Sequence, residues 1–211
     1  DIPYFDFALM NKGTNSSTTF LYDIDCSDID GDPITYYINI TKSGVVTSLN
    51  LLLNKSTGLI NHTPIEIEHG TYNIEITCGD YQYNVSDNFN YTINDTTIPE
   101  IIGTSNSGGA KRLTDTTFSV NATDEGVGIN EIIFRWNDSN IGNEEDIEYF
   151  ANLSEVNHSV SFNINTTQGK TIVWNFTVID ANGNLNIISG TQFVVENSDP
   201  IVKLVNPKNE W

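Results

Sequence analysis

Short alternating runs, separated by turn-forming residues, constrain the fold of this chain more than any other feature. The runs are rich in β-branched and aromatic residues, as strands are; examples are 34–38, 131–136, 159–164 and 171–178. Gly, Asn, Asp and Pro punctuate them, for instance at 30–33 and 181–184. No stretch keeps a helical apolar period over three turns. The pattern predicts an all-β protein, with the acidic stretch 143–146 as a solvated loop.

Three proline-containing phrases recur along the chain at intervals of about a hundred residues, with their prolines at Pro3, Pro99 and Pro200. Proline lacks an N–H and fixes its backbone angle, so it suits the entry of an edge strand at a domain junction. We therefore expect one domain at 1–96, a second at 97–197, and a linker or exchangeable strand at 198–211. Short strands at regular spacing in a module of this size are typical of a β-sandwich.

The composition excludes several classes of partner. Nine basic residues stand against 28 acidic ones in 211 residues, which gives a net charge of −19. Such a surface repels nucleic acid and anionic membranes and attracts divalent cations. No run approaches the length of about 18 apolar residues that a membrane span needs. We expect no nucleic-acid partner and no membrane insertion within this segment.

Thirteen asparagines stand in Asn-x-Ser/Thr triplets, the acceptor sequence for N-linked glycan. Strand alternation alone has no direction, yet the reversed triplet Ser/Thr-x-Asn occurs only seven times. The excess predicts a glycosylated surface, and hence an extracellular protein at the cell surface. Asn61 is doubtful because Pro64 follows its triplet. The expected acceptors are Asn15, Asn39, Asn54, Asn84, Asn90, Asn94, Asn121, Asn137, Asn152, Asn157, Asn165 and Asn175.

The chain has two cysteines, Cys26 and Cys78, and each ends a strand-like run. A zinc site needs more ligands, and the three histidines, His62, His69 and His158, are scattered along the chain. A disulfide between the two cysteines fits an oxidising exterior, and two buried free thiols are the alternative. The histidines themselves read as surface residues in turns or at strand ends.

Several pieces follow one another along the first module: Asp28-Ile29-Asp30-Gly31-Asp32-Pro33-Ile34-Thr35-Tyr36, then Leu53 with Ser56-Thr57-Gly58-Leu59-Ile60, Thr63-Pro64, Gly70-Thr71-Tyr72-Asn73-Ile74 and Asp80. In their order and spacing, which cover most of residues 20–95, they resemble the cadherin-like, Ig-like domains of prokaryotic surface proteins. It implies two tandem Ig-like (cadherin-like) β-sandwich domains followed by a C-terminal linker strand. The repeat style is similar to that of archaeal surface proteins in particular.

The second module has two distinctive stretches: 120–129, which begins Val120-Asn121-Ala122-Thr123-Asp124, and 174–184, which ends Asp180-Ala181-Asn182-Gly183-Asn184. Through these stretches it is similar to another Ig-like repeat of bacterial and archaeal surface proteins. Trp136 and Trp174 lie in alternating strands and are expected to fill the core. The resemblance implies fold and location, and it does not identify a partner.

Cadherin-like repeats often bind Ca²⁺ near domain junctions, which makes the first acidic loop a candidate metal site. Asp28, Asp30 and Asp32 alternate, so their carboxylates could converge with Asp80 and supply the oxygen ligands that Ca²⁺ prefers. In the second module Asp124, Glu125 and Asp180 could serve similarly. The alternative for the first loop is an acidic turn whose carboxylates accept backbone N–H groups.

No sequence motif for catalysis is present, such as a Gly-x-Ser-x-Gly elbow, a phosphate-binding loop or a His-Glu-x-x-His helix. We therefore expect no enzyme. The leading hypothesis is a structural module of a surface-layer protein, stalk or filament, whose partners are copies of itself or neighbouring Ig-like domains. The strand 201–205 could complete a sheet in the next subunit.

Two further hypotheses remain open. One is an adhesin that recognises carbohydrate or protein on another surface, with Tyr81 and Tyr83 as candidate contacts because sugar rings stack on exposed aromatic side chains. The other is part of a viral fibre, which the sequence does not distinguish from the leading hypothesis.

Overall fold

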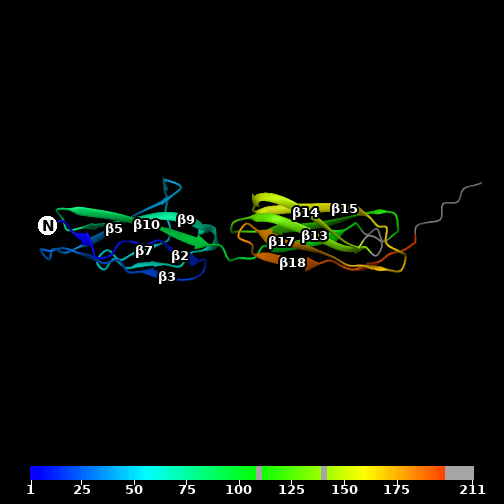
Figure 1. Cartoon of the computed structure of the whole chain (residues 1–211), viewed down its shortest axis with the longest axis horizontal. Helices are drawn as coiled ribbons and strands as arrows, with labels where there is room; N and C mark the ends of the chain where they lie inside the picture. The colour runs from blue at the N-terminus through cyan, green and yellow to red at the C-terminus, as the bar shows by residue number, and fades with distance from the viewer. Residues whose placement is uncertain (108–110, 139–141, 198–211) are drawn as a thin grey trace, which may run out of the picture. The chain divides into compact units, whose positions relative to one another are not determined.

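The computed structural model describes residues 1–107, 111–138 and 142–197 (Figure 1). The chain divides into two compact units, here called the first unit and the second unit. The first comprises Asp1–Thr97 together with Glu125–Val127, and the second comprises Ile98–Asp124 and the chain from Gly128 onward. No α-helix occurs in the described ranges, and one short 3₁₀ helix, η1, spans Glu66–Glu68. The all-β fold class predicted from the sequence is confirmed.

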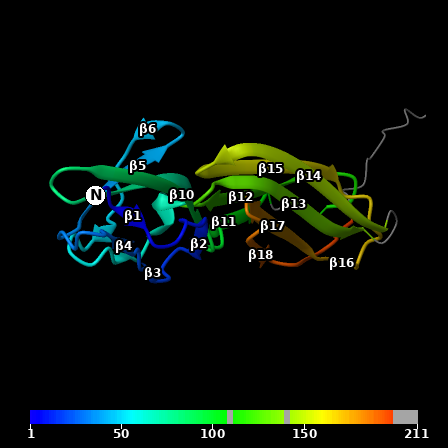
Figure 2. The same ribbon diagram turned by 60° about the vertical axis from the view of Figure 1, so that its left-hand side comes forward.

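The first unit is a sandwich of a five-stranded sheet and a three-stranded sheet, accompanied by a two-stranded ribbon. The five-stranded sheet has the order β2 (Lys12–Asn15), β10 (Asn84–Asn94), β9 (Gly70–Gly79), β5 (Thr35–Lys42) and β6 (Val45–Val46). The three-stranded sheet has the order β3 (Phe20–Tyr22), β8 (Ile60–His62) and β7 (Leu52–Leu53), and the ribbon pairs β1 (Tyr4–Phe5) with β4 (Cys26–Ser27). Figure 2 shows β5 and β6 as a hairpin at the edge of the larger sheet.

Alternation along β10 shows why this sequence forms a sandwich. Phe89, Tyr91 and Ile93 are buried, whereas Asn90 and Asn94 are exposed. The inward residues meet Phe20 of β3 and Ile60 of β8, so both sheets contribute to one core. Each such large apolar side chain stabilises the fold by about 1.5–3 kcal/mol when it is fully buried.

The disulfide predicted between Cys26 and Cys78 is present. It joins β4 to β9 with an S–S distance of 2.01 Å and a Cα–Cα distance of 6.6 Å. Cys78 is completely buried in the core of the first unit. In the chain-entropy model, a disulfide that closes a loop of this length stabilises the fold by about 4 kcal/mol, because it restricts the unfolded chain.

The second unit is also a sandwich, built from a three-stranded and a four-stranded sheet. The smaller has the order β11 (Glu100–Asn106), β12 (Asp115–Thr123) and β15 (Glu155–Asn163). The larger has the order β14 (Gly142–Leu153), β13 (Ile129–Asp138), β17 (Trp174–Asp180) and β18 (Leu185–Ser189), and β16 (Thr171–Ile172) pairs with β19 (Phe193–Val194). Phe118, Phe134 and Trp174 lie at the centre of the shared core. Trp136 and Trp174 are both buried, as predicted.

The acidic stretch 143–146 is not the solvated loop that its composition suggests, because it lies within β14 at the edge of the larger sheet. An edge strand faces solvent along one side, so it tolerates charge. Cross-strand pairing also helps: Arg135 on β13 forms an ion pair with Glu145, its partner in the strand register. The expected strand at 201–205 lies outside the described residues.

Candidate functional site

Exposure separates the predicted glycan acceptors into two groups. Nine of the twelve expected asparagines are exposed: Asn15, Asn39, Asn54, Asn84, Asn90, Asn94, Asn137, Asn152 and Asn157. The doubtful Asn61 is exposed as well. Three are half-buried: Asn121, Asn165 and Asn175. A glycan is bulky and needs an acceptor nitrogen at the surface, so the first group is geometrically suited to carry it.

Strand geometry gathers several acceptors on the outer face of the first unit's five-stranded sheet. Residues two apart on a strand share a face, and Asn84, Asn90 and Asn94 on β10 therefore lie on one side. Asn94 pairs with Asn15 on the neighbouring β2, and its Nδ2 donates a hydrogen bond of 3.2 Å to Asn15 Oδ1. Glycans on this face would shield a sheet surface that carries few apolar side chains.

The acidic loop of the first unit forms a hydrogen-bonded turn. Asp28 Oδ1 accepts the backbone N–H of Asp30 at 2.8 Å and that of Asp32 at 3.3 Å. In the described chain, no three of the four predicted calcium ligands, Asp28, Asp30, Asp32 and Asp80, bring a carboxylate oxygen within 4.8 Å of one another. Calcium binding by these residues remains a prediction and would require the turn to rearrange.

Asp80 holds the turn between β9 and β10. Its Oδ1 accepts the N–H groups of Gln82 and Tyr83 at 2.8 and 2.7 Å. The hydrogen bond from Tyr83 is the main reason why the pKa of Asp80 is lowered, because it stabilises the carboxylate. The turn presents Tyr81 with 87% of its surface exposed and Tyr83 with 48% exposed. Tyr81 has a φ of 80°, a left-handed conformation that side chains other than glycine rarely adopt.

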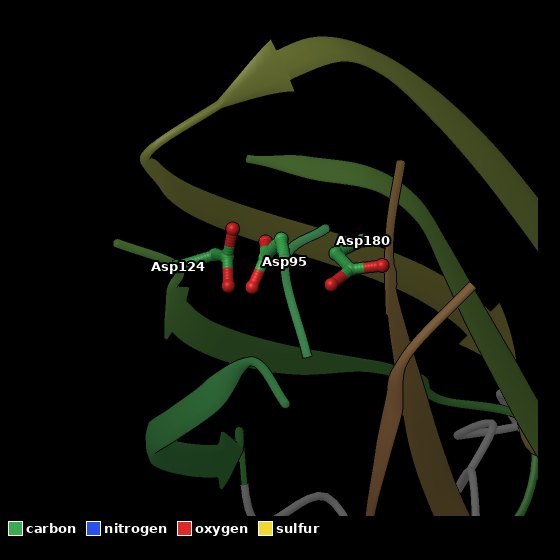
Figure 3. A group of neighbouring side chains, drawn as sticks. All are labelled: Asp95, Asp124 and Asp180. Carbon is green, nitrogen blue, oxygen red and sulfur yellow. The ribbon is translucent and has the colours of Figure 1, made fainter. Parts of the chain in front are cut away.

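Figure 3 labels three buried aspartates, of which Asp95 belongs to the first unit, and Asp124 and Asp180 to the second. One carboxylate oxygen of Asp124 lies within 4.8 Å of one of Asp180. Asp124 Oδ2 accepts the N–H of Gly128 at 2.6 Å, and Asp180 Oδ1 accepts that of Asn184 at 2.8 Å. Of the three residues predicted to bind calcium in the second module, the structure buries these two, whereas Glu125 is exposed.

The prediction that the histidines are surface residues is wrong for His62, which is only 2% exposed. Its Nδ1 lies 3.0 Å from the hydroxyl of Tyr91, and its Nε2 lies 3.3 Å from Glu68 Oε2. Burial lowers the pKa of His62 and raises that of Tyr91. The alternation of Ile60, Asn61 and His62 along β8 was the signal that His62 faces inward. His69 and His158 are half-buried.

Comparison with solved structures identifies the fold. The chain superimposes on the N-terminal four Ig domains of Dscam1 isoform 6.9 with a TM-score of 0.52 and 8% identity, over 93% of this chain and 46% of that one. Isoform 7.44 gives a TM-score of 0.50 with 10% identity and the same two coverages. The chain thus spans about half the length of these structures. Identities this low concern the fold alone.

Sequence comparisons add no relative. No protein-family model matches the chain, and no curated protein matches it significantly. Within the described residues, no helix is long and apolar enough to cross a membrane. The two sandwiches and their likeness to Ig-domain tandems together show that this chain folds as tandem Ig-like β-sandwich domains.

Proposed function

We propose that this chain is a non-enzymatic, extracellular structural module of a glycosylated surface layer, stalk or filament. The observation that carries the proposal is the exposure of nine of the twelve expected glycan acceptors, distributed over both units. The disulfide is compatible with an oxidising exterior. Tandem Ig-like domains suit a spacer role because each has its own core and is joined to the next through a short connection.

The partners in this proposal are neighbouring Ig-like domains or further copies of the chain. Strand exchange through 201–205 remains part of the proposal, although that segment lies outside the described residues. A surface with a net charge of −19 also keeps such a module soluble, and it repels other anionic surfaces at short range.

The proposal is tested by the intact mass of the protein from its natural source, under non-reducing conditions, before and after chemical deglycosylation. We expect a mass well above the 23.4 kDa of the peptide segment that falls stepwise as sugar is removed. A deglycosylated mass several times larger than 23.4 kDa would show that the segment belongs to a longer chain. An unchanged mass on treatment would contradict the glycosylated module.

A matched variant makes this test specific to one site. Thr41→Ala removes the acceptor triplet of Asn39 and leaves the exposed Asn39 itself in place. In a glycosylating host its mass should fall by one glycan relative to the wild type. Thr47→Ala, which lies outside any triplet, should keep the full mass.

A second candidate function is adhesion, which is favoured by the turn that carries Tyr81. A residue other than glycine at positive φ, such as Tyr81, costs about 1–3 kcal/mol of backbone strain. Such strained residues are concentrated at functional sites. Here the strained residue is also the most exposed large hydrophobic side chain of the described residues. The turn therefore presents an aromatic ring to solvent, where it can stack on a sugar.

Binding of soluble oligosaccharides to an array of the immobilised protein and its variants tests this candidate. Tyr81→Ala should remove binding, whereas Tyr4→Ala, at a tyrosine that is 46% exposed and has an ordinary backbone angle, should retain it. Equal binding by both variants, or no binding by the wild type, would leave the structural role alone.

A further inference from the structure

Two surface hollows formed by described residues of the second unit are each lined by one exposed and one half-buried asparagine from an acceptor triplet. The first hollow has a volume of about 310 Å³ and contains exposed Asn157 and half-buried Asn121; its lining is Gly103, Thr104, Ser105, Ser119, Val120, Asn121, Asn157, His158 and Ser159. The second has a volume of about 250 Å³ and contains exposed Asn137 and half-buried Asn175; its lining is Arg135, Trp136, Asn137, Val173 and Asn175. The same arrangement thus occurs on two different sheets.

The first hollow lies over β11, β12 and β15. Asn121 and Asn157 are direct partners in the register of β12 and β15. Two residues further along, the hydroxyls of Ser119 and Ser159 lie 2.8 Å apart. The lining contains no Lys, Arg, Asp or Glu side chain, and the Nε2 atom of its one histidine, His158, lies 3.5 Å from Asp146 Oδ2. In a chain with a net charge of −19, this is a neutral surface of hydroxyl and amide groups.

Asn121 has an unsatisfied group in this hollow. Its Oδ1 is buried and accepts no hydrogen bond from the described residues. A buried acceptor without a donor costs about 1–3 kcal/mol, and each such group calls for an explanation. A donor located in the hollow would remove this cost.

The second hollow repeats the pattern between β13 and β17. Asn175 Oδ1 is also buried and accepts no hydrogen bond within the described ranges. Asn137 is held by its oxygen, because its Oδ1 accepts the N–H of Val173 at 2.6 Å. A glycan is attached through the other amide atom, Nδ2. The hydrogen bond to Val173 therefore orients Asn137 without using the atom that carries the sugar.

We propose that the protein's own glycans bind in these hollows. The first sugar attached to Asn157 donates a hydrogen bond to Asn121 Oδ1, and the first sugar attached to Asn137 donates one to Asn175 Oδ1. Asn121 and Asn175 themselves carry no glycan. The inference rests on the proposed function, since it requires a glycosylated protein. Sugars are neutral and rich in hydroxyl donors, which matches the hydroxyl and amide lining of the first hollow; the second hollow offers two amides beside Trp136 and Arg135. The volumes of about 310 and 250 Å³ lie at and just below the lower limit of ligand pockets, about 300 Å³, as expected for one sugar ring.

The covalent step is a transfer from a glycosyl phosphate or diphosphate donor. A bond forms between Asn Nδ2 and the anomeric carbon, and the bond between that carbon and the phosphate oxygen breaks. The phosphate leaves with the bonding electrons, and one Nδ2 proton is lost to base. Asn121 and Asn175 are half-buried residues, whereas Asn157 and Asn137 are exposed, so we expect the enzyme that transfers the sugar to reach the second pair more readily.

Site mapping is the first test. The glycoprotein is treated with a glycan-releasing reagent in ¹⁸O water and digested, so that each occupied asparagine is identified by mass. We expect Asn157 and Asn137 to be occupied and Asn121 and Asn175 to be empty. Occupancy of Asn121, or an empty Asn157 beside other occupied sites, would overturn the inference and leave the proposed function intact. Absence of glycan at every site would instead remove the proposed function.

Thermal unfolding of glycosylated and unglycosylated protein tests the contact itself. In the unglycosylated protein, Asn121→Ala removes an unsatisfied group, so Tm should stay the same or rise. In the glycosylated protein the same variant should lower Tm by about 2–4 °C. Asn157→Gln should lower Tm only in the glycosylated form, and the double variant should lose no more than either single variant. An equal change in Tm for Asn121→Ala in the glycosylated and unglycosylated forms would contradict the proposed contact between the sugar and Asn121.

Discussion

The imidazole Nδ1 of His62 lies 3.0 Å from the hydroxyl oxygen of Tyr91, inside the core of the first unit. The other ring nitrogen, Nε2, lies 3.3 Å from the Glu68 carboxylate. Burial lowers the pKa of His62 below its ordinary value, although the charge of Glu68 opposes the shift. The folded state therefore favours neutral His62, and protonation favours the unfolded chain.

The first prediction concerns pH. A lowered folded-state pKa means that the contribution of His62 to stability is complete above about pH 6.5 and is lost as the pH falls below it. The slope is at most about 1.4 kcal/mol per pH unit for one proton. Urea unfolding of the first unit between pH 7.5 and 5.5 measures it. His62→Gln should flatten the dependence, and His69→Gln should keep it; an unchanged slope in His62→Gln would contradict the assignment.

The second prediction concerns the disulfide. Cys26→Ala/Cys78→Ala should lower the free energy of unfolding of the first unit by about 2–5 kcal/mol. Every tryptophan lies in the C-terminal half of the sequence, so tryptophan fluorescence does not follow the first unit. Circular dichroism should show an earlier transition while the fluorescence transition stays in place. A common shift of both transitions would show that the units do not unfold independently.

The third prediction concerns glycine. Gly58 has a φ of 74°, and a Cβ there would collide with the carbonyl oxygen of Ile24 and the ring of Tyr36. Gly31 has a similar φ of 79° but has open space around it. Gly58→Ala should therefore cost about 3 kcal/mol or more, from both backbone strain and overpacking. Gly31→Ala should cost about 1 kcal/mol, from strain alone. Chemical denaturation compares the two, and equal costs would exclude the packing term.

The fourth prediction concerns calcium. Asp124 and Asp180 have carboxylate oxygens within 4.8 Å of each other, whereas no three of Asp28, Asp30, Asp32 and Asp80 do so among the described residues. We expect millimolar Ca²⁺, the range of extracellular modules, to raise Tm, and Asp180→Asn to remove more of this increase than Asp30→Asn. A larger loss in Asp30→Asn would favour the first loop. No effect of Ca²⁺ on the wild type would contradict both sequence-based assignments.

Local patterns predicted the parts of this fold that depend on strand periodicity. The alternation around Trp136 and Trp174 indicated inward-facing side chains, and both are buried. The prediction of a loop at 143–146 was wrong because it rested on composition alone. The stretch belongs to a sheet through its pairing with the neighbouring strand, in which Arg135 lies opposite Glu145. The surface prediction was wrong for His62 because a position at a strand end does not show which face the side chain takes: His62 ends β8 and is buried.

The sequence by itself determined the all-β class, the cysteine pair and the positions of the acceptor triplets, because strand alternation, cysteine count and triplets are local properties. Only the tertiary structure decided which groups meet. Register places Asn121 opposite Asn157, and the packing of two sheets encloses His62 with Tyr91. Packing also brings Asp124 close to Asp180. These contacts join residues far apart in the chain, so they depend on how strands pair and sheets stack rather than on any local pattern.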